Sequence, residues 1–504
     1  MTRWRSHWRS RARRSGVRRL APPIALLAAA LLVAGLGAPA TAGTAAGTAA
    51  PGAPYTPVPP ANPYAGPPGT TTMHGDTGSS DTTPLAGPGA GKLSSKRNGL
   101  LSACPTVLVG SDGYPVALCT PILGQVPTVH LLDPHTGASL TSLRLTKGSL
   151  LGGVYAYIDH WNRLVVVDGS RSLLRIGHHR DAAGTWRLTI DKSLSLASAV
   201  PADDAVTGLS PDWQGRVWFA TGDGVVGTAD DTTATVRSMK LPAGERIANS
   251  ISTAPQGTAV TSTHATYLLT AAADGTPRVA WRQAYDRGQA RKPGMLSWGS
   301  GSTPTFFGPT DGTDYVTIVD NADSSVALKV YRTSTGESIC SVPVLLASHG
   351  PGSENSPIGA GRSVFVAGTY GYPYPAVPEG AGDSVPASAP FAGGLSRVDV
   401  RPDGSGCDLV WDNTVRSAAV PKLSTAEGRL HTVLRDPVIP GTTGTSLLDP
   451  YRYAEIDPST GRILRSKLVG IGALYDTLQM AGTVAPDGAY LQGTVTGILR
   501  ITAG

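Results

Sequence analysis

Residues 249–331 contain two consecutive repeats of short strands and tight turns, and this stretch decides the fold. It opens with NSI at 249–251, turns at Pro255-Gln256-Gly257 and continues through the alternating run TSTHATYLLT at 261–270. β-branched and aromatic residues at alternate positions predict short strands, and the Pro, Gly and Asp residues between them predict tight turns. We therefore interpret residues 249–331 as two blades of a β-propeller.

The same pattern of a polar turn followed by an apolar strand recurs eight times along the chain, at broadly even intervals. The turns are Asp112-Gly113, Trp161-Asn162-Arg163, Asp212 to Arg216, Gln256-Gly257, Asp311-Gly312, Ala360-Gly361-Arg362, Glu427-Gly428-Arg429 and Asp487-Gly488. A strand repeat of about 40 to 50 residues is typical of a propeller. No long amphipathic run with helical spacing occurs, so we expect few helices. The predicted fold class is all-β, a propeller of eight blades, or of seven if the first turn belongs to the ring closure.

Two segments depart from the repeat. The widest interval contains YGYPYP at 370–375 and a Pro-, Gly- and Ala-rich run to Gly394, which we interpret as a loop inserted on one face. The last repeat shows three clear strands, near Leu478, Tyr490 and Ile498. A strand near Cys104–Val109 could complete this blade and close the ring, which would remove an exposed sheet edge.

The N-terminus predicts export. Residues 1–19 contain eight arginines and no acidic residue, and the apolar run 24–36 and a small-residue cleavage site follow. This pattern is typical of a secretory signal peptide, which we place at 1–42. An uncleaved anchor is the alternative, although the apolar run is shorter than the roughly 20 residues that span a bilayer comfortably. The export route is left open.

Residues 43–92, rich in Ala, Gly, Pro and Thr, are predicted to be a disordered linker, and residues 93–504 are predicted to be the propeller domain.

Charge and cysteine content indicate an extracellular protein. The chain has 42 Lys+Arg and 36 Asp+Glu, a net charge of +6; without the eight N-terminal arginines the balance is 34 to 36, near −2. The mature protein therefore has no basic excess to attract nucleic acid. The four cysteines fit two disulfides in an oxidising compartment, and Cys104–Cys119 and Cys340–Cys407 are the natural pairs by proximity. No pair has zinc-site spacing. We expect a monomer without a transmembrane span after signal cleavage, secreted, with cell-wall association left open.

A second recurring motif is the turn Asp-Pro-x-Thr-Gly, at 133–137 and 457–461, with a degenerate copy at 332–336. It suits a hairpin between the outer strands of a blade. These turns resemble the repeats of the pyrroloquinoline-quinone-type propellers, which read roughly Ala-Leu-Asp-x-x-Thr-Gly-x-x-x-Trp. Trp281 and Trp411 are the nearest equivalents of the tryptophan that locks blades in that family. Residues 247–500 also resemble a family of secreted bacterial propellers of undefined activity. That likeness includes WRxxYDRG at 281–288, GSGSTPT at 299–305, IVDNAD at 318–323 and ENS at 354–356.

Propellers bind ligands where the innermost strands and their loops converge. The polar triplets at 248–250 and 354–356 precede two of the turns, and Asp320-Asn321 ends a strand between them. Carboxylate and amide oxygens are ligands that Ca²⁺ takes. The arrangement loosely resembles the calcium site of gluconolactonase-type propeller hydrolases. The candidate metal ligands are Asn249, Asp320, Asn321, Glu354 and Asn355. The alternative is that these side chains cap backbone groups in turns.

Residues 281–292 carry the densest polar cluster and could bind an anionic or sugar-like ligand through arginine, or could form a solvated loop with its own ion pairs. The candidate ligand-binding residues are His264, Arg282, Tyr285, Asp286, Arg287, Lys292, Trp298, Ser300, Thr303, Tyr370 and Tyr372. For His264 the alternative is a packed histidine, and for the glycine- and serine-rich run after Trp298 a simple change of chain direction.

Catalytic motifs are lacking. The sequence contains no Gly-x-Ser-x-Gly elbow, no His-Glu-x-x-His, no phosphate loop and no dinucleotide fingerprint. We therefore expect a propeller that binds an extracellular small molecule or cell-surface partner at the mouth of its central channel. A calcium-dependent lactone or ester hydrolase is the alternative. A quinone-dependent oxidoreductase is weaker, because the adjacent cysteines expected of alcohol-oxidising quinoproteins are missing.

Overall fold

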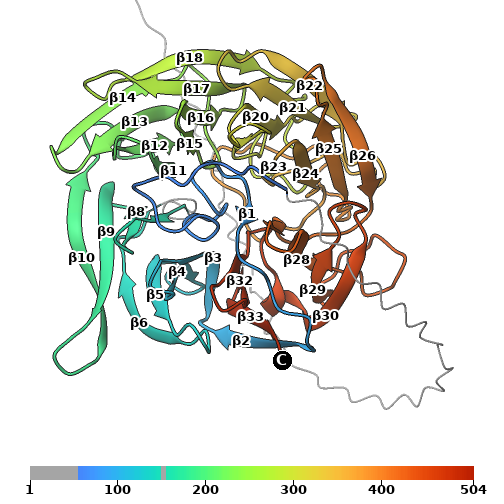
Figure 1. The fold of residues 1–504 in the computed structure, drawn as a ribbon, viewed down its shortest axis with the longest axis horizontal. Helices are drawn as coiled ribbons and strands as arrows, with labels where there is room; N and C mark the ends of the chain where they lie inside the picture. The colour runs from blue at the N-terminus through green and yellow to red at the C-terminus, as the bar shows by residue number, and fades with distance from the viewer. Residues whose placement is uncertain (1–54, 149–154) are drawn as a thin grey trace, which may run out of the picture. The chain divides into compact units, whose positions relative to one another are not determined.

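The structure is a computed structural model that describes residues 55–148 and 155–504. The predicted signal peptide, 1–42, and residues 43–54 lie outside this range. The described residues form eight β-sheets around a central axis, and the predicted propeller of eight blades is confirmed (Figure 1). Within these residues the helical element is one short turn, η1 (Ala473–Tyr475). No helix in the described ranges has the length and apolar character that a membrane span needs.

Each blade is built from four antiparallel strands with its first strand near the axis and its last at the rim, and blade 7 gains a fifth, parallel strand, β1 (Thr82–Thr83), at its axial edge. Blades 1 and 2 contain β3 (Ser102–Val109), β4 (Pro115–Pro121), β5 (Thr128–Leu132), β6 (Ser139–Arg144) and β7 (Tyr157–Ile158), β8 (Leu164–Val167), β9 (Ser172–Arg180), β10 (Trp186–Ser195). Blades 3 and 4 contain β11 (Val206–Pro211), β12 (Val217–Thr221), β13 (Val225–Asp230), β14 (Thr235–Lys240) and β15 (Ser252–Ala254), β16 (Gly257–Thr261), β17 (Ala265–Ala271), β18 (Pro277–Ala284).

The second half of the ring repeats this order. Blades 5 and 6 contain β19 (Thr305–Phe307), β20 (Tyr315–Val319), β21 (Ala327–Arg332), β22 (Ser338–Pro343) and β23 (Ile358–Ala360), β24 (Ser363–Ala367), β25 (Leu395–Val400), β26 (Cys407–Asn413). Blade 7 contains β27 (Lys422–Ser424), β28 (Arg429–Arg435), β29 (Pro450–Ile456) and β30 (Ile463–Ile471). Blade 8 contains β31 (Thr483–Val484), β32 (Tyr490–Thr494), β33 (Gly497–Ala503) and, at the rim, β2 (Leu93–Gly99).

All eight turns singled out in the sequence join the first strand of a blade to its second. Because antiparallel strands alternate in direction, these turns share one face of the ring with the turns between third and fourth strands. We call this the turn face. The connections between blades and the turns between second and third strands lie on the opposite side, the connection face. The inserted loop, 368–394, joins β24 to β25 and therefore lies on the connection face.

The Asp-Pro-x-Thr-Gly turns join third and fourth strands, as predicted, and each receives a side chain from the preceding blade. Trp281 of blade 4 donates its indole N–H to Thr333 O at 2.7 Å, and Trp411 of blade 6 donates to Pro458 O at 3.0 Å. At the turn of blade 1 the donor is Asn98 of β2, which reaches Thr136 O at 2.9 Å. The two tryptophans therefore lock blades as the resemblance implied, and an asparagine makes the corresponding contact at the ring closure.

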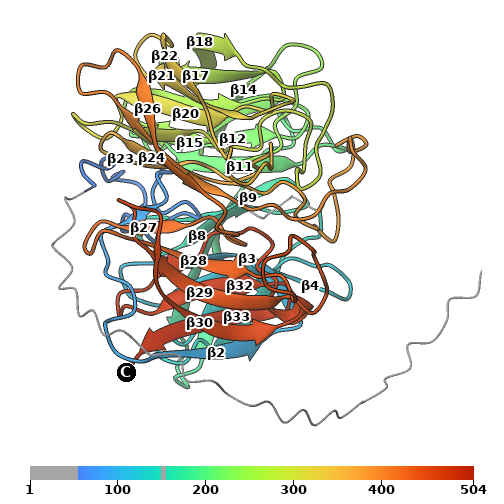
Figure 2. The same cartoon turned by 90° about the vertical axis from the view of Figure 1, so that its right-hand side faces the viewer.

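The ring is closed by a strand other than the predicted one. β2 pairs with β33 along its whole length, from Leu93 against Ala503 to Gly99 against Gly497, at the edge of blade 8 (Figure 2). Residues 104–109, expected in this role, belong to β3, the innermost strand of blade 1. The error has a physical origin. A rim strand is covered on few sides, so β2 (LSSKRNG) lacks the apolar run that makes β3 recognisable in the sequence.

Residues 55–92, expected to be a disordered linker, are instead packed against the propeller. They cross its axis and then run to the rim strand β30, where Arg465 donates to Pro88 O at 2.6 Å; we call them the axial segment. Backbone N–H groups of first strands donate to its carbonyls: Thr253 to Thr77 at 2.6 Å, Phe306 to Gly78 at 2.8 Å, Gly359 to Ser80 at 3.0 Å. Further contacts reach β3, β7, β11 and β27, and β1 (Thr82–Thr83) pairs in parallel with β27. The composition suggested disorder because the segment has no apolar face of its own. It is ordered because the exposed backbone edges of seven first strands supply its hydrogen bonds.

A polar network anchors the axial segment at the centre of the ring. The Lys422 ammonium of β27 lies 2.9 Å from Asp81 Oδ1, and both side chains are fully buried. The other Asp81 oxygen is 2.9 Å from His74 Nδ1, and His74 Nε2 faces the hydroxyl of Ser356 at 3.4 Å. A buried charge is tolerated when it is paired and hydrogen-bonded, so this network fixes the position of the segment.

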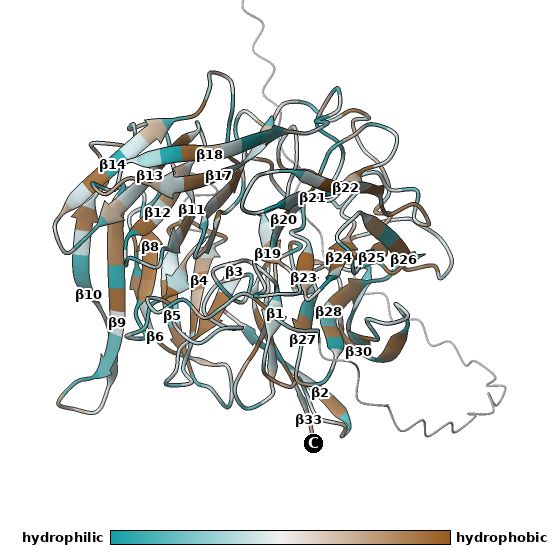
Figure 3. Ribbon diagram, turned by 45° about the horizontal axis from the view of Figure 1, so that its top comes forward, coloured by the Kyte–Doolittle hydropathy of each residue, from teal (hydrophilic) through white to brown (hydrophobic). Residues whose placement is uncertain are grey.

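The hydrophobic core is distributed between neighbouring blades. One cluster joins Val116 and Leu131 of blade 1 to Val166 and Ile176 of blade 2, and another joins Leu328 of blade 5 to strands of blade 6. Figure 3 shows hydrophobic segments, in brown, along strands such as β9 and β23. Each sheet therefore buries both faces only because its neighbours cover them.

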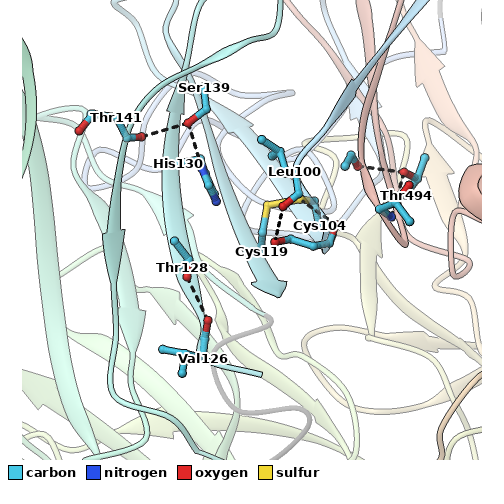
Figure 4. Close-up of a disulfide and its surroundings, with 12 residues drawn as sticks. Leu100, Cys104, Cys119, Val126, Thr128, His130, Ser139, Thr141 and Thr494 are labelled. Carbon is cyan, nitrogen blue, oxygen red and sulfur yellow. Dashed lines mark hydrogen bonds between the residues drawn. A yellow bond between two sulfur atoms is a disulfide. The ribbon is translucent and has the colours of Figure 1, made fainter. Parts of the chain in front are cut away.

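Both predicted disulfides are present. Cys104 of β3 is bonded to Cys119 of β4 within blade 1 (Figure 4). Cys340 of β22 is bonded to Cys407 of β26, so the second bond links the rim strands of blades 5 and 6. Two disulfides are compatible with an extracellular protein.

Removing one member of the Lys422–Asp81 pair should destabilise the protein severely. Lys422→Met and Asp81→Asn each leave a buried group without its partner, and we expect each to lower the free energy of unfolding by about 3–5 kcal/mol. The double variant should lose less stability than the sum of the two single-variant losses. Guanidinium unfolding measures all three, with Arg401→Ala, which breaks an exposed ion pair with Asp408, as the control that changes little. Small, additive losses would show that the pair does not hold the segment.

Candidate functional site

A pocket of about 990 Å³ opens on the connection face over blades 3 and 4. Its walls come from three kinds of loop: connections between blades, the turns of blades 3 and 4 between second and third strands, and the inserted loop of blade 6. The residues that carry its polar and aromatic groups are Asp203, Asp204, Thr207, Asp223, Arg246, Thr263, His264, Arg287, Ser297, Trp298 and Glu379. Loops presented by a rigid ring are where propellers can place a binding site.

Arg287, Trp298 and His264 form the centre of the pocket wall. The Arg287 guanidinium lies over the Trp298 indole, 3.9 Å from the ring centroid, and its Nη1 is 2.7 Å from His264 Nε2. Burial, followed by the charge of Arg287, lowers the pKa of His264. The imidazole is therefore neutral and its Nε2 accepts the guanidinium N–H, while Nδ1 faces the Thr263 hydroxyl at 3.0 Å. Trp298 remains 39% exposed, so part of the indole is open to a ligand.

A second part of the lining is acidic, and we call it the acidic wall. Asp223 forms an ion pair with Arg246 at 2.7 Å. Asp204 Oδ1 accepts the N–H groups of Ala205 and Asp223, and its Oδ2 is buried without a hydrogen-bond partner among the described residues. A buried carboxylate oxygen without a donor is costly, and a ligand hydroxyl would satisfy it.

Of the eleven ligand-binding candidates, His264, Arg287 and Trp298 line this pocket. Several of the others hold the connecting loop 285–304 in shape. Tyr285 Oη donates to Ser262 O at 2.5 Å and accepts from Ser300 N at 2.9 Å, while Ser300 Oγ donates to Val319 O. Lys292 is buried and donates to Pro351 O at 2.7 Å.

The remaining candidates have other partners. Arg282 pairs with Glu245 at 2.7 Å, and Asp286 accepts the N–H of Gly288. Tyr372 is buried against Asp476, and Thr303 is hydrogen-bonded to Tyr155. The half-buried Tyr370 packs beside Gly352. These side chains build the connection face instead of lining the pocket.

Two of the five candidate metal ligands meet. Asn249 Nδ2 donates to Glu354 Oε1 at 3.2 Å, and Glu354 Oε2 accepts the N–H of Leu296 at 2.9 Å. Both residues lie in connections just before their first strands, not within them as expected. The pair adjoins the pocket, because Ala248 and Leu296 belong to its wall. Burial raises the pKa of Glu354 to about 7.

The other three candidates lie in separate hydrogen-bond networks. Asp320 Oδ1 accepts the N–H groups of Ala322 and Ala327, Asn321 donates to Arg287 O, and Asn355 donates to Gln479 at 3.1 Å.

Within the described ranges no cluster of three or more His, Cys, Asp or Glu side chains could hold a metal. The side-chain amide of Asn249 directs its N–H group, a donor, and not its oxygen toward the Glu354 carboxylate. The residues as they lie do not fit a Ca²⁺ site, which needs converging oxygens.

Several residues of the pocket carry no signal in the sequence. Arg246, Asp204 and Asp223 stand in ordinary turn sequences, and the wall at 378–382 belongs to a loop that is distant in sequence. Their convergence follows from the placement of blades 3, 4 and 6 around one axis. A regular strand repeat predicts that loops share a face, but not which of them touch.

Comparisons with known proteins support the fold. No protein-family model matches the chain, and no curated protein matches it either. Among solved structures it is similar to the quinohemoprotein alcohol dehydrogenase from Comamonas testosteroni, with a TM-score of 0.53 and 11% identity over 86% of this chain and 80% of that one. Quinohemoprotein alcohol dehydrogenase ADHIIG from Pseudomonas putida HK5 gives a TM-score of 0.50 and 12% identity over the same shares. The chain therefore shares its overall fold with these two structures.

This likeness concerns the fold and not the chemistry. Alcohol-oxidising quinoproteins would be expected to carry adjacent cysteines, and in this chain the two bonded pairs are separated by 15 and 67 residues. The residues present do not fit a quinone-dependent dehydrogenase of that kind.

Glu354→Gln should change how stability depends on pH. A carboxyl group whose pKa is raised in the folded state favours folding while it is protonated, so its contribution is lost as pH rises from about 4.5 towards 7. From pH 5 to pH 8 the wild-type protein should therefore lose up to about 3 kcal/mol relative to the glutamine variant. Urea unfolding at both pH values measures this difference. Glu337→Gln, at an exposed position, is the control; parallel pH profiles for wild type and Glu354→Gln would contradict the prediction.

Proposed function

We propose that this protein is a secreted, non-catalytic propeller that binds a neutral, saccharide-like ligand in the pocket of the connection face. The observation that carries the proposal is the combination of a partly exposed indole, Trp298, with hydrogen-bond donors and acceptors in the same lining. Sugars present apolar C–H faces and many hydroxyl groups, so they suit such a site.

The charge of the lining favours a neutral ligand over an anionic one. Two guanidinium groups, of Arg246 and Arg287, stand against four carboxylates, of Asp203, Asp204, Asp223 and Glu379. Arg246 is already paired with Asp223. An anion would gain one contact with Arg287 and meet an excess of negative charge, whereas hydroxyl groups can use both donors and acceptors.

The axis itself is a poor place for the ligand. The axial segment fills the turn-face end, where Thr77, Gly78 and Ser80 are hydrogen-bonded to first strands. The proposed site is therefore the pocket on the connection face. It lies beside the mouth of the central channel and not in the mouth itself, where we expected the ligand.

Contacts between loops organise the pocket before a ligand arrives. Arg291, on the same connection as Arg287 and Trp298, donates its Nε to Gly382 O at 2.8 Å, and its carbonyl accepts the N–H of Val385 at 2.8 Å. These bonds attach the inserted loop to the wall that carries the indole. A preorganised wall reduces the entropy that binding must overcome.

Export is part of the same proposal. The predicted signal peptide supports it, as do two disulfides that are compatible with an oxidising compartment. The likeness to a family of secreted bacterial propellers points the same way.

Trp298→Ala should lower saccharide affinity at least about tenfold, because the stacking surface is lost. Binding partners are found on an array of neutral and acidic oligosaccharides, and affinities are measured by isothermal titration calorimetry. Arg287→Gln should weaken the same ligands, while Trp161→Ala, which removes an exposed indole outside the pocket, serves as the matched control. A preference for acidic oligosaccharides, or equal affinities for wild type and Trp298→Ala, would overturn the proposal.

A further inference from the structure

A second pocket, of about 430 Å³, lies on the turn face between blades 1 and 2. It is lined by Asp112 from the first turn of blade 1, Trp161 from the first turn of blade 2, and His178, Thr189 and Asp191 from strands β9 and β10. Nothing in the proposed saccharide site depends on it, because the two pockets lie on opposite faces.

Asp191 is directed into this pocket by a distortion of the sheet. The register of β9 and β10 shifts between Ile190 and Lys192, so Asp191 is a bulge residue without a cross-strand partner. Its carboxylate lies directly over Gly177, where a Cβ atom would collide with Oδ2. Bulges commonly redirect a side chain beside a functional site. Thr189 donates to Oδ1 at 2.8 Å, and Oδ2 has no hydrogen-bond partner among the described residues.

Asp112 supplies a second carboxylate and is held in place by His178. Asp112 Oδ2 is 2.7 Å from His178 Nε2, and the His178 side chain is only 7% exposed. His178 Nδ1 is buried and has no hydrogen-bond partner in the described part of the chain. A buried side chain with one nitrogen that lacks a hydrogen bond costs stability. Such a group is unusual at a position with a purely structural role.

Trp161 adds an aromatic surface that already attracts a cation. The indole is 66% exposed, and the guanidinium of Arg163 lies 4.6 Å from its centroid. Arg163 also lines the pocket and is paired with the buried carboxylate of Asp159 at 2.8 Å, an oxygen that it shares with Arg175. The lining therefore offers the carboxylates of Asp191 and Asp112 and an exposed indole beside this one guanidinium.

We propose that this pocket binds an ammonium-bearing ligand, with Asp191 and Asp112 as its charge partners and Trp161 as its aromatic contact. Carboxylates attract an ammonium group directly, and the face of an indole attracts it through its quadrupole. The same chemistry is offered by an amino sugar and by a lysine side chain.

Calorimetric titration of the full protein with a glucosamine oligosaccharide and with Nα-acetyl-lysine methylamide tests the proposal and distinguishes these two sources. Asp191→Asn keeps the shape of the side chain and removes its charge, and it should weaken the ligand that binds about tenfold. Trp161→Ala should weaken it similarly. Asp181→Asn, on the turn that joins β9 to β10, is the control expected to leave the affinity unchanged.

The fully N-acetylated oligosaccharide and the Nε-acetylated lysine derivative carry no ammonium group and should bind at least about tenfold more weakly. Equal binding of the acetylated ligands would overturn the proposal, as would undiminished binding by Asp191→Asn. Failure of both ammonium ligands to bind the wild-type protein would overturn it as well. Because the two pockets share no lining residue, a negative result here leaves the saccharide proposal standing.

Discussion

The hydrogen bonds between the axial segment and the first strands are the constraint on which the rest of the structure depends. Eight first strands converge on one axis, and on the inner edge of each strand backbone N–H and C=O groups lack a strand partner. Water or another chain must satisfy them. Residues 55–92 do so for seven blades, and the Lys422–Asp81 pair fixes their register. The same segment continues into β2, so a single stretch of chain fills the axis and closes the ring.

The architecture could be predicted from the sequence because local residues determine the turns that define it. Each of the eight polar turns needs particular residues, such as Gly113 or Gly215 at positive φ, wherever the chain reverses. The rim turns, with Gly137 and Gly461 at positive φ, are equally local. The axial segment has no such signature, since its order is supplied by strands up to 377 residues away. Composition alone therefore led to the wrong expectation of disorder for it.

The candidate site was predictable only in part, for the same reason. His264, Arg287 and Trp298 lie close together in one polar stretch of the sequence, so their clustering could be anticipated. Most of the other candidates in that stretch have structural roles, as Tyr285 shows by bridging Ser262 and Ser300. The acidic wall comes from the connection between blades 2 and 3, from a turn of blade 3 and from the inserted loop. Tertiary placement, which local sequence does not encode, decides which polar residues face a pocket.

The path of the axial segment also orders events during biogenesis. Residues 55–99 are synthesised before any other part of the propeller. Their partners include β27 and β33, which are among the last strands to be made. Contacts of such long sequence separation form slowly, because most of the chain must be fixed before they can be made. The first part of the domain to emerge is therefore among the last to fold, and until then the rim of blade 8 remains an open edge.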